Sequence, residues 1–297
     1  MSRERALVDG DWLEARLGDP SVAILEVDER PLVYNVGHVP GAHCVDWRRD
    51  LQDPVTRDVP APEAMRALWR RVGIGPETTV VLYGDMSNWY PCFALWLFKL
   101  NGLGDVRLLD GGRQAWLAER RPLTTEVPPP AERDDAPAPS RHAELRAHWP
   151  DVAGAAARGT QLLDVRTPAE YRGELLAEPG YPQELAQRPG HVPGALNVSW
   201  DACVAPDGRV RSDDELRALL AERGVRLDAP AITYCRIGER SAHTWFVLHE
   251  LLDLPDVRNY DGSWTEWGSM VGMPVALGPE PGAPLDAATL PALAPSR

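Results

Sequence analysis

A long internal repeat constrains the fold of this chain more than any other feature. The hexapeptide GHVPGA occurs at 37–42 and again at 190–195. Two further matches share one offset of 151 positions and need no gap between them: Tyr83 with Tyr234, and Asp110 with Asp261. A repeat of this length indicates a duplicated domain rather than a solenoid unit. The length of 297 residues also predicts two domains of ordinary size.

Each half of the chain alternates strand and helix patterns. Apolar runs predict six strands, at 22–27, 79–83, 106–109, 161–165, 231–234 and 257–260. Between them, one helix begins at the capping box 212–215 and ends at Gly224, and its counterpart runs from Pro62 to Gly73. This alternation predicts an α/β fold in which each half is a parallel sheet with helices on both faces. Active sites of such sheets lie at the C-terminal ends of strands.

Proline-rich segments mark the predicted boundaries. Residues 127–141, which are also charged, predict an extended linker between a first domain at 1–126 and a second at 142–278. The last segment, 279–297, is rich in proline and alanine and predicts an irregular tail.

Composition excludes several classes of partner. The net charge of −13 argues against binding to nucleic acid or to an anionic membrane surface. The N-terminal residues show no signal peptide, and the longest apolar stretch near a helix, 93–98, is too short to span a bilayer. None of the four cysteines has metal-ligand spacing, so we expect a reduced, cytoplasmic setting with one working thiol and three packing residues.

The working thiol is predicted to be Cys235, which follows the apolar run 231–234. A helical pattern begins at about Ser241, and the loop between is bracketed by Arg236 and Arg240. Backbone N–H groups at a helix N-terminus form an anion site, and two guanidinium groups should lower the pKa of the thiol. The alternative is a small core residue. The flanking arginines favour a nucleophilic cysteine.

This loop, with the sequence CRIGER at 235–240, resembles the active-site loop of rhodaneses, the thiosulfate sulfurtransferases. The segment 259–267 is similar to tandem-domain bacterial members. Phosphatase-like relatives close a wider loop with an arginine six residues after the cysteine, whereas here Arg240 comes five after and the tighter loop suits a persulfide. The resemblance implies two duplicated rhodanese-like domains, of which the first is inactive because Gly84 occupies the position of Cys235.

The resemblance also implies a set of residues around the substrate. The loop contributes Arg236, Ile237, Gly238, Glu239, Arg240 and Ser241. Trp264 is expected to face the site because its match in the inactive half is Arg113, whereas Trp267 matches Trp116 and is assigned to the core. Trp89 and Tyr90 match an aromatic pair that lines the substrate entrance in the family; ordinary core aromatics are the alternative.

An insertion distinguishes the second half. Asp164 and His191 are 27 positions apart, whereas their counterparts Glu26 and His38 are 12 apart. Many relatives bind the sulfonate of thiosulfate with an arginine at the position that is Glu170 here. Arg172, two residues on, is the proposed substitute, and an exposed, solvated arginine is the alternative.

Three conspicuous polar residues of the second half are assigned structural roles. The inactive half keeps a carboxylate, Glu26, at the position of Asp164, and a histidine at the position of His191. A group that the inactive half retains is not specific to catalysis. Asp164, Arg166 and His191 are therefore predicted to support the fold.

The predicted reaction is double-displacement sulfur transfer. The Cys235 thiolate takes the outer sulfur of thiosulfate, expels sulfite and passes the persulfide sulfur to cyanide or a thiol. No metal or organic cofactor is required, and the partners are small molecules. Two alternatives remain: a 3-mercaptopyruvate sulfurtransferase, against which the two arginines argue, and a non-enzymatic sulfur carrier or redox-binding module.

Overall fold

The computed structural model describes residues 3–28, 32–179 and 185–286. It divides into two compact units, one formed by Met1–Ala143 with Val204–Val210 and the other by Glu144–Cys203 with Arg211–Arg297. From residue 287 onward, the predicted tail lies outside the described residues. No helix in these described ranges combines the length and the apolar character needed to cross a bilayer.

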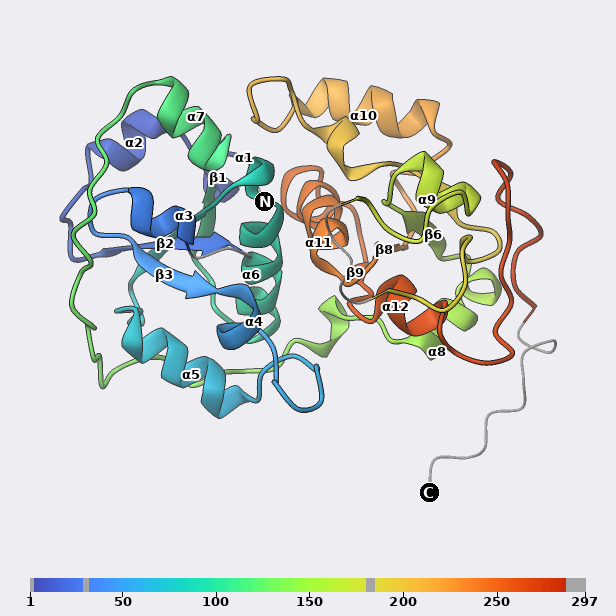
Figure 1. Cartoon of the computed structure of the whole chain (residues 1–297), viewed down its shortest axis with the longest axis horizontal. Coiled ribbons are helices and arrows are strands. Elements are labelled where there is room, and N and C mark those ends of the chain that lie inside the picture. Colours follow the sequence, from blue (N-terminus) through green and yellow to red (C-terminus); the bar gives the residue numbers. More distant parts are fainter. Residues whose placement is uncertain (1–2, 29–31, 180–184, 287–297) are drawn as a thin grey trace. The chain divides into compact units, whose positions relative to one another are not determined.

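The first unit is built on a five-stranded parallel sheet with the order β1-β5-β4-β2-β3. Its strands are β1 Leu7–Val8, β2 Val22–Asp28, β3 His43–Asp46, β4 Thr79–Tyr83 and β5 Val106–Leu109. Its helices are α1 Arg3–Ala6, α2 Gly10–Glu14, α3 Leu32–Val36, α4 Trp47–Asp50, α5 Pro62–Arg71, α6 Trp89–Leu100 and α7 Gly112–Ala118. In Figure 1, α5 lies on one side of the strands and α2 and α7 lie on the other.

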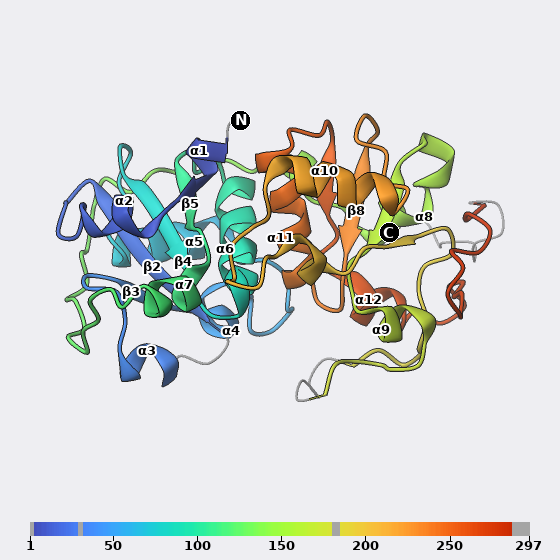
Figure 2. The ribbon, with the colours of Figure 1, turned by 90° about the horizontal axis from the view of Figure 1, so that it is seen from above.

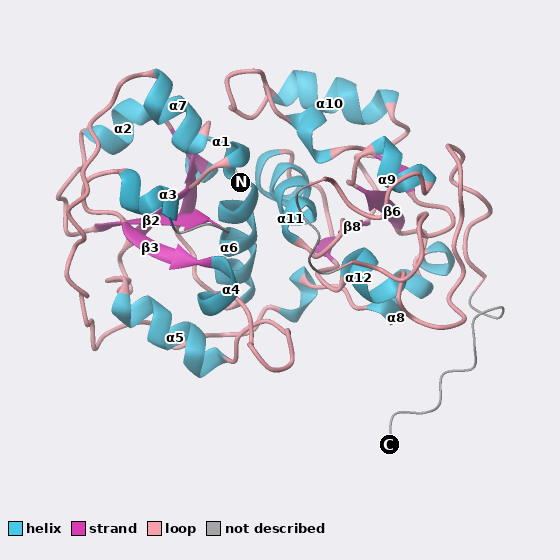
Figure 3. Cartoon of the chain, in the orientation of Figure 1, coloured by secondary structure: helices cyan, strands magenta, loops and turns pink. Residues whose placement is uncertain are grey.

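The second unit has a four-stranded parallel sheet with the order β7-β6-β8-β9. Its strands are β6 Gln161–Asp164, β7 Leu196–Asn197, β8 Ala231–Tyr234 and β9 Val257–Asn259. Its helices are α8 Trp149–Ala153, α9 Pro168–Arg172, α10 Asp213–Glu222, α11 Glu239–Phe246 and α12 Ser263–Trp267. Helix α10 lies on one side of the strands, and α8 and α12 lie on the other (Figure 3).

The sequence patterns explain these elements. All six predicted strands are present, with ends that differ by at most one residue. Figure 2 labels β2, β4, β5 and β8 among them. The predicted capping box stands at the N-terminus of α10, where the Ser212 N–H donates to the Glu215 carboxylate over 3.0 Å. Helix α11 begins at Glu239, two residues before the predicted start, because Gly238 takes the left-handed conformation before it.

Matching hydrogen bonds show the repeat in three dimensions. In the first unit the Arg113 N–H donates to the Gly84 carbonyl over 2.9 Å, and in the second the Trp264 N–H donates to the Cys235 carbonyl over 3.0 Å. These pairs have the same sequence offset as the repeat. The turn that leads to α7 or α12 is therefore tied to the end of the preceding central strand in both halves.

The first unit has no room for a side chain at Gly84, the counterpart of Cys235 in the repeat. A Cβ at Gly84 would overlap the Val27 carbonyl oxygen and lie 2.9 Å from a carboxylate oxygen of Asp28. No side chain fits there unless β2 moves. The position lacks a thiol and also the space for one.

We expect Gly84→Ala to destabilise the protein by about 1–3 kcal/mol, because the added methyl group meets backbone that cannot rotate away. Gly104→Ala is the matched control, since a Cβ at Gly104 meets nothing within 4 Å. Urea unfolding of both variants measures the difference. Equal unfolding free energies would show that β2 yields freely.

Candidate active site

Cys235 lies at the C-terminal end of β8, fully buried, immediately before the loop that begins α11. Its Sγ accepts the Gly238 N–H at 3.1 Å, and the N–H groups of Ile237 and Ser241 act to lower its pKa. Gly238 has φ +100°, and a Cβ there would lie 2.7 Å from the Asp261 Cα, so only glycine fits. The loop thus surrounds one sulfur with N–H donors, which suits an anionic sulfur species.

Ser241 and Ile237 belong to this loop in different ways. The Ser241 hydroxyl donates to the Asn259 side-chain oxygen at 2.6 Å and lies 3.0 Å from the Gly238 carbonyl oxygen. Ile237 is buried, with 3% of the residue exposed. The Ser241 hydroxyl is thus engaged by the protein, whereas its backbone N–H faces Cys235. A contact of Ile237 or Ser241 with substrate stays a prediction.

Ser263 is a site residue that the sequence analysis missed. Its hydroxyl accepts the Cys235 N–H at 3.1 Å and donates to the Tyr260 carbonyl at 2.7 Å. It does so from φ +52°, a left-handed conformation unusual for serine. The matching residue of the first unit, Gly112, has φ +54°. A serine in the second half opposite a glycine in the first half was the available signal.

Glu239 is the closest carboxylate to the nucleophile. Its Oε2 lies 3.3 Å from the Cys235 Sγ, in hydrogen-bond contact with the thiol. Burial, together with the charge of Glu239, raises the pKa of Cys235, and Arg240 acts in the opposite direction without cancelling the effect. The predicted lowering of the thiol pKa is therefore wrong, because the sequence did not reveal how completely the loop is buried.

Arg240 is held by a carboxylate of its own unit. Its two terminal nitrogens donate to Glu170 at 2.7 and 3.0 Å, and both side chains are buried. The Arg236 guanidinium lies 3.8 Å from Glu239. Each arginine of the loop thus has an acidic neighbour, and the expected excess of positive charge beside Cys235 is absent among the described residues.

Arg172 does not take the place predicted for it. It is the last residue of α9, where it lies 2.7 Å from Glu174, and its side chain is 36% exposed. Residues two apart on a helix point about 200° apart, so Arg172 points away from the buried Glu170. The exposed, solvated alternative describes it correctly.

The predicted aromatic contacts are buried in the core. Trp264 is fully buried, its indole N–H donates to the Arg188 carbonyl at 2.9 Å, and the Arg166 guanidinium lies 4.6 Å from its ring centre. Cys235 is equally buried, so a contact of Trp264 with substrate stays a prediction. Trp89 and Tyr90 are stacked at the start of α6 in the first unit, with ring centres 5.7 Å apart, and both are buried.

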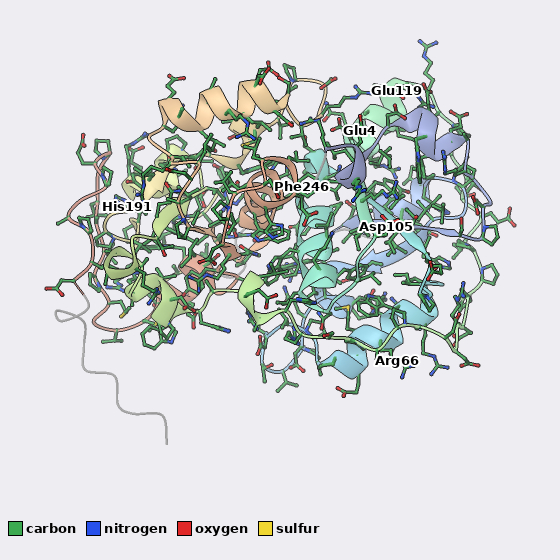
Figure 4. The ribbon with its side chains drawn as sticks, turned by 180° about the vertical axis from the view of Figure 1, so that it is seen from behind. Glu4, Arg66, Asp105, Glu119, His191 and Phe246 are labelled. Carbon is green, nitrogen blue, oxygen red and sulfur yellow. The ribbon has the colours of Figure 1, made fainter. Side chains whose placement is uncertain are left out.

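The three residues assigned to structural support do form buried structure. Arg166 donates to Asp164 at 2.5 Å and to the Gly190 carbonyl at 2.7 Å. The His191 ring stacks on Tyr171 at 3.6 Å, and Figure 4 shows it among the side chains of the second unit. The His191 Nδ1 lies 2.8 Å from the Tyr171 carbonyl oxygen, so Arg166 and His191 both bind backbone of their own unit.

Comparisons with known proteins identify the family of the chain. The model of the Rhodanese-like domain matches residues 9–119 and again 150–270. The chain belongs to the rhodanese family. This membership confirms the resemblance of the CRIGER loop and the duplicated α/β fold.

Related rhodanese-family proteins carry different names. The chain is 52% identical over 280 residues to "Sulfur carrier protein TtuD" of Thermus thermophilus, covering 92% of this chain and 97% of that one. It is 49% identical over 284 residues to "Putative thiosulfate sulfurtransferase SseA" of Mycobacterium tuberculosis, covering 93% of this chain and 92% of that one. The structure of YnjE is similar with a TM-score of 0.80 and 26% identity, covering 93% of this chain and 68% of that one. The structure of a variant of EanB in complex with ergothioneine is similar with a TM-score of 0.81 and 25% identity, covering 93% of this chain and 71% of that one. These relatives support sulfur transfer and leave the donor and the acceptor open.

We expect Ser263→Gly to be more stable than Ser263→Ala by about 1 kcal/mol, because only glycine relieves the left-handed backbone. Both variants lose the hydroxyl that accepts the Cys235 N–H, so the comparison isolates backbone strain. Urea unfolding of the two proteins side by side provides the measurement. A Ser263→Ala protein at least as stable as Ser263→Gly would show that position 263 carries no strain.

The buried pair of Glu170 and Arg240 predicts a pH dependence. Burial favours the neutral carboxyl, but the hydrogen bonds and charge of Arg240 outweigh it and lower the pKa of Glu170 below the usual value. Glu170→Gln should cost about 3–5 kcal/mol at pH 7, because it leaves a buried arginine without its counter-charge. The lowered pKa means that this stabilisation is complete above the ordinary glutamate pKa and is lost as pH falls through the folded-state pKa.

Unfolding free energies of wild type and Glu170→Gln at several pH values check this expectation. The difference should be largest near neutrality and should shrink in acid. The matched control is Glu174→Gln, whose partner Arg172 is exposed and whose loss should leave stability nearly unchanged. A Glu170→Gln difference that does not vary with pH would contradict the assignment.

Proposed function

We propose that the second domain, 142–278, is a thiosulfate sulfurtransferase in which Cys235 carries the transferred sulfur as a persulfide, and that the first domain, 1–126, has no catalytic role. The observation that carries the proposal is the ring of backbone N–H groups around the Cys235 Sγ. Such donors stabilise a negative sulfur without needing a metal or a cofactor. The absence of space for a side chain at Gly84 supports a single active site.

The reaction follows as two displacements. The Cys235 thiolate attacks the outer sulfur of thiosulfate, the bond to the sulfonate sulfur breaks, and sulfite leaves with the electron pair. The persulfide then gives its outer sulfur to cyanide or a thiol, and the thiolate is regenerated. Cys44, Cys92 and Cys203 are free and take no part, and reduced thiols of this kind support a cytoplasmic setting.

A sulfur-carrier function is the second candidate, and two observations favour it. Each loop arginine has an acidic neighbour, so selection of a dianionic donor by positive charge is weaker than the sequence indicates. The relative from Thermus thermophilus is also named a sulfur carrier. A carrier forms the same persulfide but takes sulfur from, or gives it to, another protein.

The same observations reopen the choice of small-molecule donor. The two arginines argued for thiosulfate over 3-mercaptopyruvate by their charge, and that charge is balanced here. A thiocyanate assay with cyanide as acceptor and each donor in turn separates the three possibilities. Turnover with thiosulfate above that with 3-mercaptopyruvate supports the proposal, the reverse order favours the mercaptopyruvate enzyme, and negligible turnover with both favours the carrier.

We expect Cys235→Ser to abolish both persulfide formation and thiocyanate production, because the alcohol cannot hold a sulfane sulfur. The matched control replaces Cys44, Cys92 and Cys203 together and should retain activity. Mass spectrometry of the protein after thiosulfate treatment detects the added sulfur. Turnover by Cys235→Ser would overturn the assignment of the nucleophile.

A further inference from the structure

We propose that Glu239 is a catalytic residue that accepts the proton of the Cys235 thiol when the persulfide forms. The proposal rests on the function proposed above. Glu239 lies in the first turn of α11, four residues after the nucleophile, and its Oε2 is 3.3 Å from the sulfur. Since both side chains are fully buried, the proton can move within an existing hydrogen bond without a water molecule.

The other carboxylates beside the loop are bound to arginines. Among the described residues near the loop, Glu170 is held by Arg240, and Asp261 is held by Arg146 through two bonds of 2.7 and 2.9 Å. The second oxygen of Glu239 lies 3.8 Å from the Arg236 guanidinium.

The histidine of α11, His243, lies one turn further along the helix, and its ring packs against the ring of Trp200 with centres 5.3 Å apart. Burial lowers its pKa to about 4. Among the described residues, the hydrogen-bond contact of the thiol is with Glu239. Glu239 is thus the carboxylate in direct contact with the reacting sulfur, while the other two carboxylates beside the loop bind arginines.

The site needs such a proton acceptor because the resting thiol is protonated. Burial and the negative charge of Glu239 raise the pKa of Cys235. Transfer of the proton to Glu239 creates the thiolate and, at the same time, removes the negative charge that opposes it. The thiolate then keeps the N–H of Gly238 and those of Ile237 and Ser241 as its stabilising neighbours.

The proposed step balances in atoms and electrons. The Cys235 S–H bond breaks, its proton goes to the Glu239 Oε2, and its electron pair stays on sulfur. That pair forms the new bond to the outer sulfur of thiosulfate. The old sulfur–sulfur bond breaks, and its electron pair leaves with sulfite. The products are a persulfide anion and a neutral Glu239. When the acceptor removes the outer sulfur, Cys235 leaves as a thiolate and recovers the proton, so no oxidant or reductant is consumed.

Glu239→Gln keeps the shape of the side chain and removes its ability to accept a proton. We expect the single-turnover rate of persulfide formation in wild type to be nearly constant with pH below the thiol pKa, because the proton moves internally. In Glu239→Gln the rate should fall about tenfold per pH unit below that pKa, because the thiol must release its proton to solvent. Glu239→Asp keeps a carboxylate and should retain the flat profile. Glu174→Gln is the control for the loss of a surface charge.

A second measurement does not depend on the sulfur donor. Alkylation of Cys235 by iodoacetamide, followed peptide by peptide, reports the thiol pKa directly. Its midpoint should shift to lower pH in Glu239→Gln, because a negative charge is removed. Parallel rate profiles for wild type and Glu239→Gln, or an unchanged alkylation midpoint, would overturn the role of Glu239. If thiosulfate forms no persulfide on the wild-type protein, the proposed sulfur donor is wrong. The role of Glu239 is then tested by the alkylation midpoint alone.

Discussion

Each half of the molecule depends on one buried ion pair that joins the first central strand to the GHVPGA turn. In the second unit Arg166 binds Asp164 and the Gly190 carbonyl, and in the first unit Arg113 binds Glu26 and the Gly37 carbonyl. The arginines come from different places in the sequence, since Arg113 matches Trp264 in the repeat. Trp264 packs against Arg166, so one position of the repeat supplies the guanidinium in one half and its aromatic neighbour in the other.

Pairing of charges also governs the candidate active site. A buried guanidinium without a counter-charge is costly, and the loop arginines accordingly lie beside Glu170 and Glu239. What remains around the sulfur is a set of backbone dipoles and one carboxylate. This arrangement stabilises a single negative charge on sulfur, but it does not attract a dianion through an excess of positive charge. The shape of the loop therefore suits an anionic sulfur on Cys235 and does not select a particular donor.

The sequence predicted the fold well because the signals were local or repeated. Hydrophobic runs, the Ser212 cap and the GHVPGA motif each specify nearby backbone, and the structure confirms them. The site was harder, because charge pairing depends on contacts between distant segments. Glu170 and Arg240 are 70 positions apart, and nothing local shows that they meet. The role predicted for Arg172 failed for a local reason, because the residue lies on helix α9 and points away from Glu170. Comparison of Ser263 with Gly112 would have revealed a residue beside Cys235 from the repeat alone.

The closed loop at Gly84 affects how the duplicated halves can evolve. A mutation that placed a cysteine there would bring its Cβ against the Val27 carbonyl oxygen of β2. The first half would therefore need compensating changes in β2 before position 84 could hold a thiol. A single substitution cannot make the two halves alike at this position.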